Sequence, residues 1–143
     1  MSKPKLHLTL KTPFLELLDE AVEMVIADTD EGQLTFLPEH ASVSGAITAG
    51  KIEVRWAGHD KTYFARQGVF DLDNHTGKLK IMVLECELVS DIEIQSVKEH
   101  LQEIENDLAN PGELSEMKYR YLADEKVAVE KMATVIGDKR SRE

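Results

Sequence analysis

The spacing of the apolar residues changes near residue 90, and this change constrains the fold of the 143-residue chain most strongly. Before it, several short segments carry an apolar side chain at every second position: Leu6, Leu8 and Leu10; Val22, Met24 and Ile26; Ile52, Val54 and Trp56. Such alternation is typical of strands that bury one face. Gly, Asp and Asn separate the segments, as turns require. The pattern predicts an N-terminal antiparallel β-sandwich or barrel over residues 1–89.

Two of these segments support more detailed expectations. Glu53 and Arg55 alternate with the apolar residues of their segment, so both are expected to face water. The run from Ile81 to Leu84 is apolar at every position, so it is expected to lie between the two layers with both faces buried.

After Val89 the apolar residues follow a helical period. The first stripe consists of Ile94, Val97, Leu101, Ile104 and Leu108. Ser90, with Glu93 three residues later, predicts a capping box, and Asn110-Pro111-Gly112 predicts the end of this helix. A second helix is expected from about Leu114 to Gly137, with a stripe of Leu114, Met117, Tyr121, Ala128, Met132 and Val135 or Ile136. The pattern of residues 90–143 therefore predicts a C-terminal α-helical hairpin. Two helices alone have little core, so the hairpin is expected to pack against the β domain or against another protein.

Charge and composition exclude several classes of function. The 17 Lys and Arg against 27 Asp and Glu give a net charge of −10, which repels phosphate backbones and argues against nucleic acid as a partner. Cys86 is the one cysteine and is expected to be a buried, inert thiol. No run approaches the roughly 20 apolar residues that cross a bilayer, so any membrane association is expected through a partner. The motifs of phosphate loops, dinucleotide folds, zinc proteases and serine hydrolases are missing from the sequence.

Two groups of metal-binding residue types fall in predicted turns: His40, His59 and His75, and the carboxylates Asp28, Asp30 and Glu31. The histidines would form a site only if their turns met at one end of the sandwich. Neither group has a spacing that is diagnostic of a metal site, so exposed turn residues are the favoured interpretation and no metal or other cofactor is expected. The residues alone favour a binding or regulatory module over an enzyme.

Three stretches resemble signatures of the epsilon subunit of F-type ATP synthases. The signature G-E-x-x-(I/L/F)-L-P-G-H-A-P…L-x-x-G-x-(V/I) is similar to Gly32-Gln33-Leu34-Thr35-Phe36-Leu37-Pro38-Glu39-His40-Ala41 followed by Ala46-Ile47 and Ala49-Gly50-Lys51-Ile52. The pattern F-x-V-S-G-G-F-x-E-V is similar to Phe64-Ala65-Arg66-Gln67-Gly68-Val69-Phe70-Asp71-Leu72. The strand N-x-V-T-V-L is similar to Lys78-Leu79-Lys80-Ile81-Met82-Val83-Leu84. The order of sandwich and hairpin also matches across essentially the whole chain.

The resemblance implies a non-catalytic subunit of the central stalk, or rotor, of a proton- or sodium-translocating ATP synthase. In that family the sandwich binds the gamma subunit and sits on the c-ring, and the hairpin can inhibit ATP hydrolysis through transient contact with the catalytic beta subunit. The implied location is peripheral, on the cytoplasmic face of a bacterial plasma membrane or the equivalent face of an organelle inner membrane. One alternative is a free-standing β-sandwich binding module that dimerises through its helices. Another is an all-β metal-dependent enzyme of cupin type that would use the turn histidines.

The resemblance also implies roles for individual residues of the sandwich. Pro38 and His40 match the family's turn near the gamma contact, and Gln33 takes the place of a frequent Glu in the loop that faces the c-ring. Glu39 and Gln67 stand where the family has Gly. If the turn at Glu39 needs a positive φ, that residue is expected to be strained.

For the helices, the resemblance bears on two activities of the family, ATP binding and inhibition of ATP hydrolysis. Some family members bind ATP through I/L-D-x-x-R-A, but Ser96 stands at the Arg position of that motif, so no ATP binding is expected. Basic residues of the family's second helix meet an acidic segment of the beta subunit, and the candidates for this inhibitory contact are Lys118, Arg120, Lys126 and Lys131. Acidic neighbours dilute them, so weak inhibition is expected.

Overall fold

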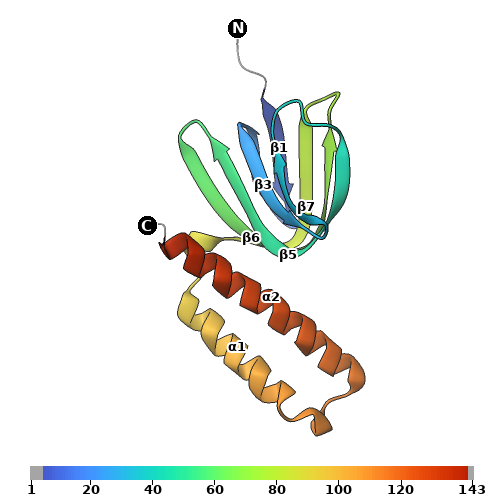
Figure 1. The fold of residues 1–143 in the computed structure, drawn as a ribbon, viewed down its shortest axis with the longest axis vertical. Coiled ribbons are helices and arrows are strands. Elements are labelled where there is room, and N and C mark those ends of the chain that lie inside the picture. Colours follow the sequence, from blue (N-terminus) through green and yellow to red (C-terminus); the bar gives the residue numbers. More distant parts are fainter. Residues whose placement is uncertain (1–4, 142–143) are drawn as a thin grey trace. The chain divides into compact units, whose positions relative to one another are not determined.

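The computed structural model describes residues 5–141, and it forms a β-rich unit followed by a helical one (Figure 1). The chain divides into these two compact units between Leu88 and Val89. The strands are β1 (Leu6–Lys11), β2 (Glu16–Val22), β3 (Met24–Thr29), β4 (Gly32–Phe36), β5 (Val43–Trp56), β6 (His59–Asp73) and β7 (Lys78–Leu88). Within the described part of the chain, no helix is both long and apolar enough to span a membrane.

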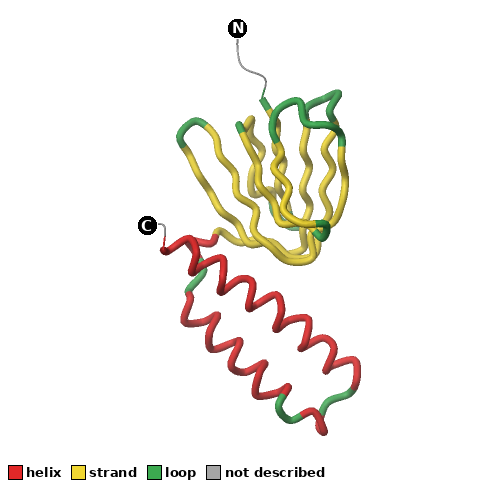
Figure 2. The backbone as a smooth tube through the Cα atoms, in the orientation of Figure 1, coloured by secondary structure: helices red, strands yellow, loops and turns green. Residues whose placement is uncertain are grey.

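The seven strands form one hydrogen-bonded sheet in the order β2-β1-β7-β6-β5-β3-β4 that folds over into two layers (Figure 2). β1 pairs with Lys78–Met82 in the first half of β7, whereas β3 pairs with Ile52–Arg55 in the second half of β5. The long strands β5, β6 and β7 therefore take part in both layers. All strand pairs are antiparallel except β1 with β7, which is parallel. The predicted β-sandwich is confirmed.

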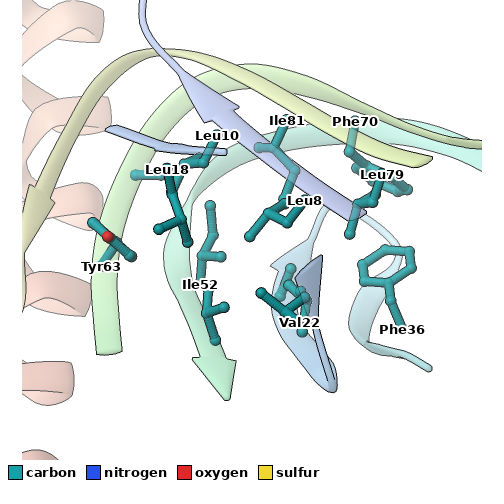
Figure 3. Close-up of a cluster of buried hydrophobic side chains, with 14 of the residues drawn as sticks. Leu8, Leu10, Leu18, Val22, Phe36, Ile52, Tyr63, Phe70, Leu79 and Ile81 are labelled. Atoms are coloured by element: carbon teal, nitrogen blue, oxygen red, sulfur yellow. The ribbon is translucent and has the colours of Figure 1, made fainter. Parts of the chain in front are cut away.

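The core lies between the two layers and is made of side chains at alternate positions (Figure 3). Leu6, Leu8 and Leu10 of β1 are buried, and the intervening residues are partly exposed, which confirms the alternation predicted for this strand. The other large, fully buried side chains include Val22, Val25, Phe36, Ile47, Ile52, Val54, Leu79 and Ile81. Burial of these apolar surfaces is the main favourable contribution to the stability of the sandwich.

The expectation that Val22, Met24 and Ile26 share one buried face is wrong. β2 ends at Val22, and a bend at Glu23 separates it from β3, so the alternation restarts in the opposite phase. In β3 the buried residues are Val25 and its second neighbour Ala27 instead.

The expectation that β7 is apolar on both faces because it is buried on both faces is also wrong. Ile81 and Val83 point into the core, but Met82 and Leu84 are 44% and 55% exposed on the outer face. Val69 pairs with Met82 on the neighbouring strand and is exposed as well. These three residues form an exposed apolar patch on the outer face of β6 and β7.

Glu53 is a third exception, because it is buried although it alternates with core residues. Its carboxylate accepts a hydrogen bond from Nη2 of Arg55 at 3.1 Å, and its side chain is only 8% exposed. The same hydrogen bond raises the pKa of the Arg55 guanidinium above its ordinary value. The charged partner two residues away satisfies the carboxylate, as the burial of a charge requires.

Gly68 allows β6 and β7 to approach each other closely. A Cβ at this position would lie 2.3 Å from the carbonyl oxygen of Met82 and 2.7 Å from Cα of Val83, both of which are backbone atoms. Real Cβ atoms essentially never come this close to other heavy atoms. The neighbouring Gln67 adopts a left-handed conformation with φ of 57°. Glycine at 68 is therefore needed for the pairing of these two strands.

The second unit is a pair of packed helices. It consists of a 3-10 turn, η1 (Val89–Asp91), then α1 (Ile94–Leu108), a second 3-10 turn, η2 (Pro111–Glu113), and α2 (Glu116–Ser141). The stripe predicted for α1 is confirmed, since its members are buried or partly buried and its polar residues are exposed. The break at Asn110-Pro111-Gly112 is confirmed by η2.

The predicted helix ends are only partly correct. Ser90 does not cap α1, because it lies within η1 and the N-cap position belongs to Glu93, which makes no side-chain capping bond. Ser115 precedes α2 and caps it, because its Oγ accepts a hydrogen bond from the backbone N–H of Lys118 at 3.1 Å. Gly137 does not end α2, which continues to Ser141.

The stripe predicted for α2 is correct only in its second half. Ala128 and Ile136 are buried, together with Val129, which the pattern did not include. Met117 and Tyr121 are 83% and 64% exposed, so the first two turns of α2 present apolar side chains to the surface.

Candidate functional site

The loop between β4 and β5 carries three of the residues singled out in the sequence. We call residues 37–42 the Pro38 loop; it contains Pro38, Glu39 and His40. It lies beside the turn between β6 and β7 at one end of the sandwich (Figure 2). Asn74 of that turn donates hydrogen bonds from Nδ2 to the carbonyl oxygens of Glu39, at 3.1 Å, and His40, at 2.8 Å.

The backbone of the Pro38 loop turns through a left-handed residue. Glu39 has φ of 69°, and the backbone N–H of His40 donates to the carbonyl oxygen of Leu37 at 3.1 Å. A non-glycine residue in this conformation costs about 1–2 kcal/mol. The turn therefore does require a positive φ at the position where the related signature has Gly.

The His40 ring is held from two sides. Its Nδ1 lies 2.7 Å from the carbonyl oxygen of Ala41, and because a carbonyl only accepts, Nδ1 donates and carries a proton. The ring packs at 5.8 Å between centroids against Phe36, a fully buried core residue. The core thus fixes the ring, and Nε2 is left for a further hydrogen bond.

Gln33 lies near the other end of β4, beside the turn between β3 and β4. It is exposed and pairs with Asp28 of β3. The carboxylate of Asp30 in this turn accepts hydrogen bonds from the backbone N–H and the hydroxyl of Thr48, at 2.8 and 3.0 Å. Asp28 accepts one from the backbone N–H of Lys51 at 3.1 Å. These two carboxylates thus anchor the turn to β5, which accounts for them without a cation.

The candidate interface residues of the sandwich therefore form two separate surfaces. One is the Pro38 loop, and the other is the exposed Gln33 beside its turn. Three residues of β4, Leu34 to Phe36, lie between Gln33 and the Pro38 loop, and a strand rises about 3.3 Å per residue.

The three turn histidines are not brought together. His40 and His75 lie at the same end of the sandwich, but His59 lies at the tip of the β5–β6 hairpin, at the far end of both long strands. Among residues 5–141, no group of three or more His, Cys, Asp and Glu side chains has a geometry that could hold a metal ion.

The basic candidates of α2 differ in their surroundings. Lys118, Arg120 and Lys131 are exposed, and Lys126 is partly buried. Arg120 pairs with Glu116 at 3.2 Å and Lys126 with Glu130 at 3.7 Å, each one helical turn away. Pairs of this kind contribute only about 0.3–0.5 kcal/mol, so a partner could replace them.

The start of α2 also exposes apolar side chains. Met117 and Tyr121 were predicted to lie in a buried stripe, and Tyr119 was not singled out in the sequence. Met117, Tyr119 and Tyr121 alternate with Lys118 and Arg120, and all five are exposed. We call residues 117–121 the α2 tip. It combines apolar area with positive charge, which suits a partner with an acidic and partly apolar surface.

Two remaining residues have simpler environments. Ser96 is exposed in the first turn of α1. It offers a hydroxyl rather than a cation at the Arg position of the ATP-binding motif. Cys86 is partly buried on β7, and burial raises the pKa of its thiol to about 12. This agrees with the expectation of an inert thiol.

Comparisons with known proteins identify the family. The model of the ATP synthase delta/epsilon chain beta-sandwich domain matches residues 5–89. The chloroplastic ATP synthase epsilon chain of Anthoceros angustus is 30% identical over 104 residues, which cover 73% of this chain and 74% of that one. A chain in the structure of the Euglena gracilis mitochondrial ATP synthase OSCP/F1/c-ring has the same fold, with a TM-score of 0.80 and 20% identity over 94% of this chain and 82% of that one. Another, in the central stalk/c-ring structure of the Tetrahymena thermophila mitochondrial ATP synthase, gives a TM-score of 0.65 and 18% identity over 95% and 99%. The chain therefore belongs to the family of ATP synthase delta/epsilon chains.

Proposed function

We propose that this chain is a non-catalytic epsilon subunit in the central stalk of a proton- or sodium-translocating F-type ATP synthase. The match of the family model to the whole sandwich carries this proposal. The central stalk and c-ring context of the structural neighbours supports it. In this proposal residues 1–89 bind the gamma subunit and the c-ring and couple the catalytic head to that ring, whereas residues 90–143 are regulatory.

The two separate surfaces of the sandwich support a coupling role. We assign the Pro38 loop to the gamma subunit and the surface around Gln33 to the c-ring. A subunit that couples two partners needs contacts at two places, and the Pro38 loop and Gln33 lie toward opposite ends of β4. The amide of Gln33 can donate and accept hydrogen bonds but supplies no charge, so a salt bridge from this residue to the ring is not part of the proposal.

The same proposal gives the chain its location. It associates with the membrane only through the complex, on the cytoplasmic face of a bacterial plasma membrane or the equivalent face of an organelle inner membrane. Ser96 supplies no cation for phosphate oxygens, so the proposal includes no ATP site in α1.

Co-expression with the gamma subunit tests this function. The chain is expected to co-purify with gamma as a stoichiometric complex under gentle conditions, because the Pro38 loop is a preformed surface. A chain that elutes as a self-associated dimer and leaves gamma behind would instead support the free-standing module. The oligomeric state measured by light scattering separates these two outcomes.

The α2 tip supports the proposal that the hairpin can inhibit ATP hydrolysis. Its exposed cations and aromatic side chains are suited to an acidic surface of the catalytic beta subunit. Arg120 already pairs with Glu116, and Lys126 with Glu130, so part of the positive charge is compensated within the helix. We therefore propose a transient contact and a weak brake.

Replacing Lys118 and Arg120 together by alanine is expected to raise the ATP hydrolysis rate of the assembled synthase about twofold to fivefold. Each exposed charge pair across such an interface is worth about 0.2–0.5 kcal/mol, so the loss of two pairs together corresponds to this range. The rate is measured on the complete enzyme reconstituted with each variant. Lys98→Ala, an exposed cation of α1, is the matched control and should leave the rate unchanged. An equal rise in both variants, or none in either, would contradict a brake at the α2 tip.

A further inference from the structure

We propose that Asn74 is a positioning residue that holds the Pro38 loop in the conformation that binds the gamma subunit. The inference rests on the proposed function for the identity of the partner, but its structural argument is independent of it. Asn74 lies in the turn between β6 and β7, 34 residues in sequence from His40, and it was not singled out in the sequence.

Asn74 makes hydrogen bonds to three residues of the loop. Its side-chain Nδ2 donates to the carbonyl oxygens of Glu39 and His40, and its backbone N–H donates to Oγ of Ser42 at 2.8 Å. A side-chain amide suits this task, because one nitrogen carries two hydrogens that can reach two neighbouring carbonyls. An aspartate of the same shape would instead place carboxylate oxygens against those carbonyls.

The turn that carries Asn74 is itself held in place. The backbone N–H of His75 donates to Oδ1 of Asp73 at 2.9 Å, and that of Gly77 donates to the carbonyl oxygen of Asp73 at 2.8 Å. The carbonyl oxygen of Gly77 in turn accepts from the backbone N–H of His7 at 2.9 Å, which ties the turn to the start of β1. Asn74 therefore projects from a fixed platform.

The Pro38 loop needs such support because Glu39 is in the left-handed region. A non-glycine residue prefers to leave that region. Leaving it would change the orientation of the carbonyl groups of Glu39 and of the next residue, His40. Asn74 binds both of these carbonyl oxygens, so its amide opposes that change. The clamp thereby keeps the loop preorganised in a chain that has Glu rather than Gly at this position, and preorganisation improves affinity.

Asn74→Asp tests the proposal in the full-length chain. The affinity for the gamma subunit is expected to fall about tenfold, because two donors are lost and the free loop must be reordered on binding. The backbone amide of His40, which closes the turn by donating to Leu37, is expected to exchange its hydrogen about tenfold faster. Thr76→Ala is the matched control, since its hydroxyl donates to the carbonyl oxygen of Asp73 within the same turn, at 3.5 Å; it should leave both quantities unchanged.

A double-mutant cycle separates positioning from a general loss of stability. In a Glu39→Gly background the left-handed conformation needs no support, so Asn74→Asp should weaken gamma binding less than twofold. An unchanged affinity in Asn74→Asp, or an equal loss in both backgrounds, would overturn the proposal.

If the unmodified chain does not bind gamma, the proposed function fails and the His40 exchange rate decides about Asn74 alone. Faster exchange in Asn74→Asp than in Thr76→Ala would support positioning, and equal rates would overturn it.

Discussion

Gly68→Ala is expected to lower the free energy of unfolding of the sandwich by about 3 kcal/mol or more, or to prevent its folding. The added methyl would overlap the backbone of Met82 and Val83, which cannot yield without separating β6 from β7. Both strands belong to the centre of the sheet, so their separation would disturb the whole unit. Urea unfolding followed by the fluorescence of Trp56, the one tryptophan of the chain, measures the effect in the sandwich.

Gly137→Ala is the matched control for this substitution. Apart from its chain neighbours and the adjacent backbone of α2, no heavy atom of the described residues lies within 4 Å of a Cβ at this position. Alanine should therefore stabilise the helix by up to about 1 kcal/mol, through helix propensity alone. A similar loss of stability in both variants would mean that the close approach of β6 and β7 is not what requires Gly68.

Alkylation of Cys86 at pH 8 is expected to be about a thousandfold slower in the folded chain than in the unfolded one. Only the thiolate reacts, and burial raises the thiol pKa from 9.0 to about 12. At a pH below both values each unit of pKa reduces the thiolate fraction about tenfold. Iodoacetamide labelling followed by mass spectrometry, with and without urea, gives the two rates. Rates within tenfold of each other would contradict a shielded thiol.

The raised pKa of Cys86 also predicts how its contribution to stability depends on pH. The pKa is higher in the folded chain, so the folded chain retains the proton where the unfolded chain loses it. The contribution of this group is therefore fully present below about pH 9 and is lost progressively as the pH rises from there towards about 12. Replacing Cys86 by alanine should flatten this part of the stability profile.

The spacing of apolar residues correctly predicted the buried face of an element where the same repeat continues without interruption along the whole segment. β1 and α1 are of this kind, and their buried residues were correctly identified. The pattern misled where two strands meet without a recognisable turn, as at Glu23, and where an outer face is apolar, as at Met82 and Leu84. Alternation cannot distinguish a face that is buried in the core from an apolar face that remains exposed.

The candidate site shows the same division between local and distant interactions. The left-handed conformation of Glu39 could be anticipated from a glycine in the related signature, because backbone conformation is a local property. The hydrogen bonds of Asn74 could not, because they join loops that are far apart in the sequence. Likewise, Asp28 and Asp30 resembled ligands in the sequence but bind backbone and hydroxyl groups of β5 in the structure.

The long pairing of β5 and β6 has a mechanical consequence for the proposed role in coupling the catalytic head to the c-ring. The two strands pair from Val43 with Leu72 at one end to Trp56 with His59 at the other, and so they run through both layers. A twisting load applied between the ends of this hairpin acts as shear along the strands and stretches many backbone hydrogen bonds at the same time. Such a ladder resists deformation far better than one whose bonds open one after another, so the sandwich can act as a stiff link rather than a spring.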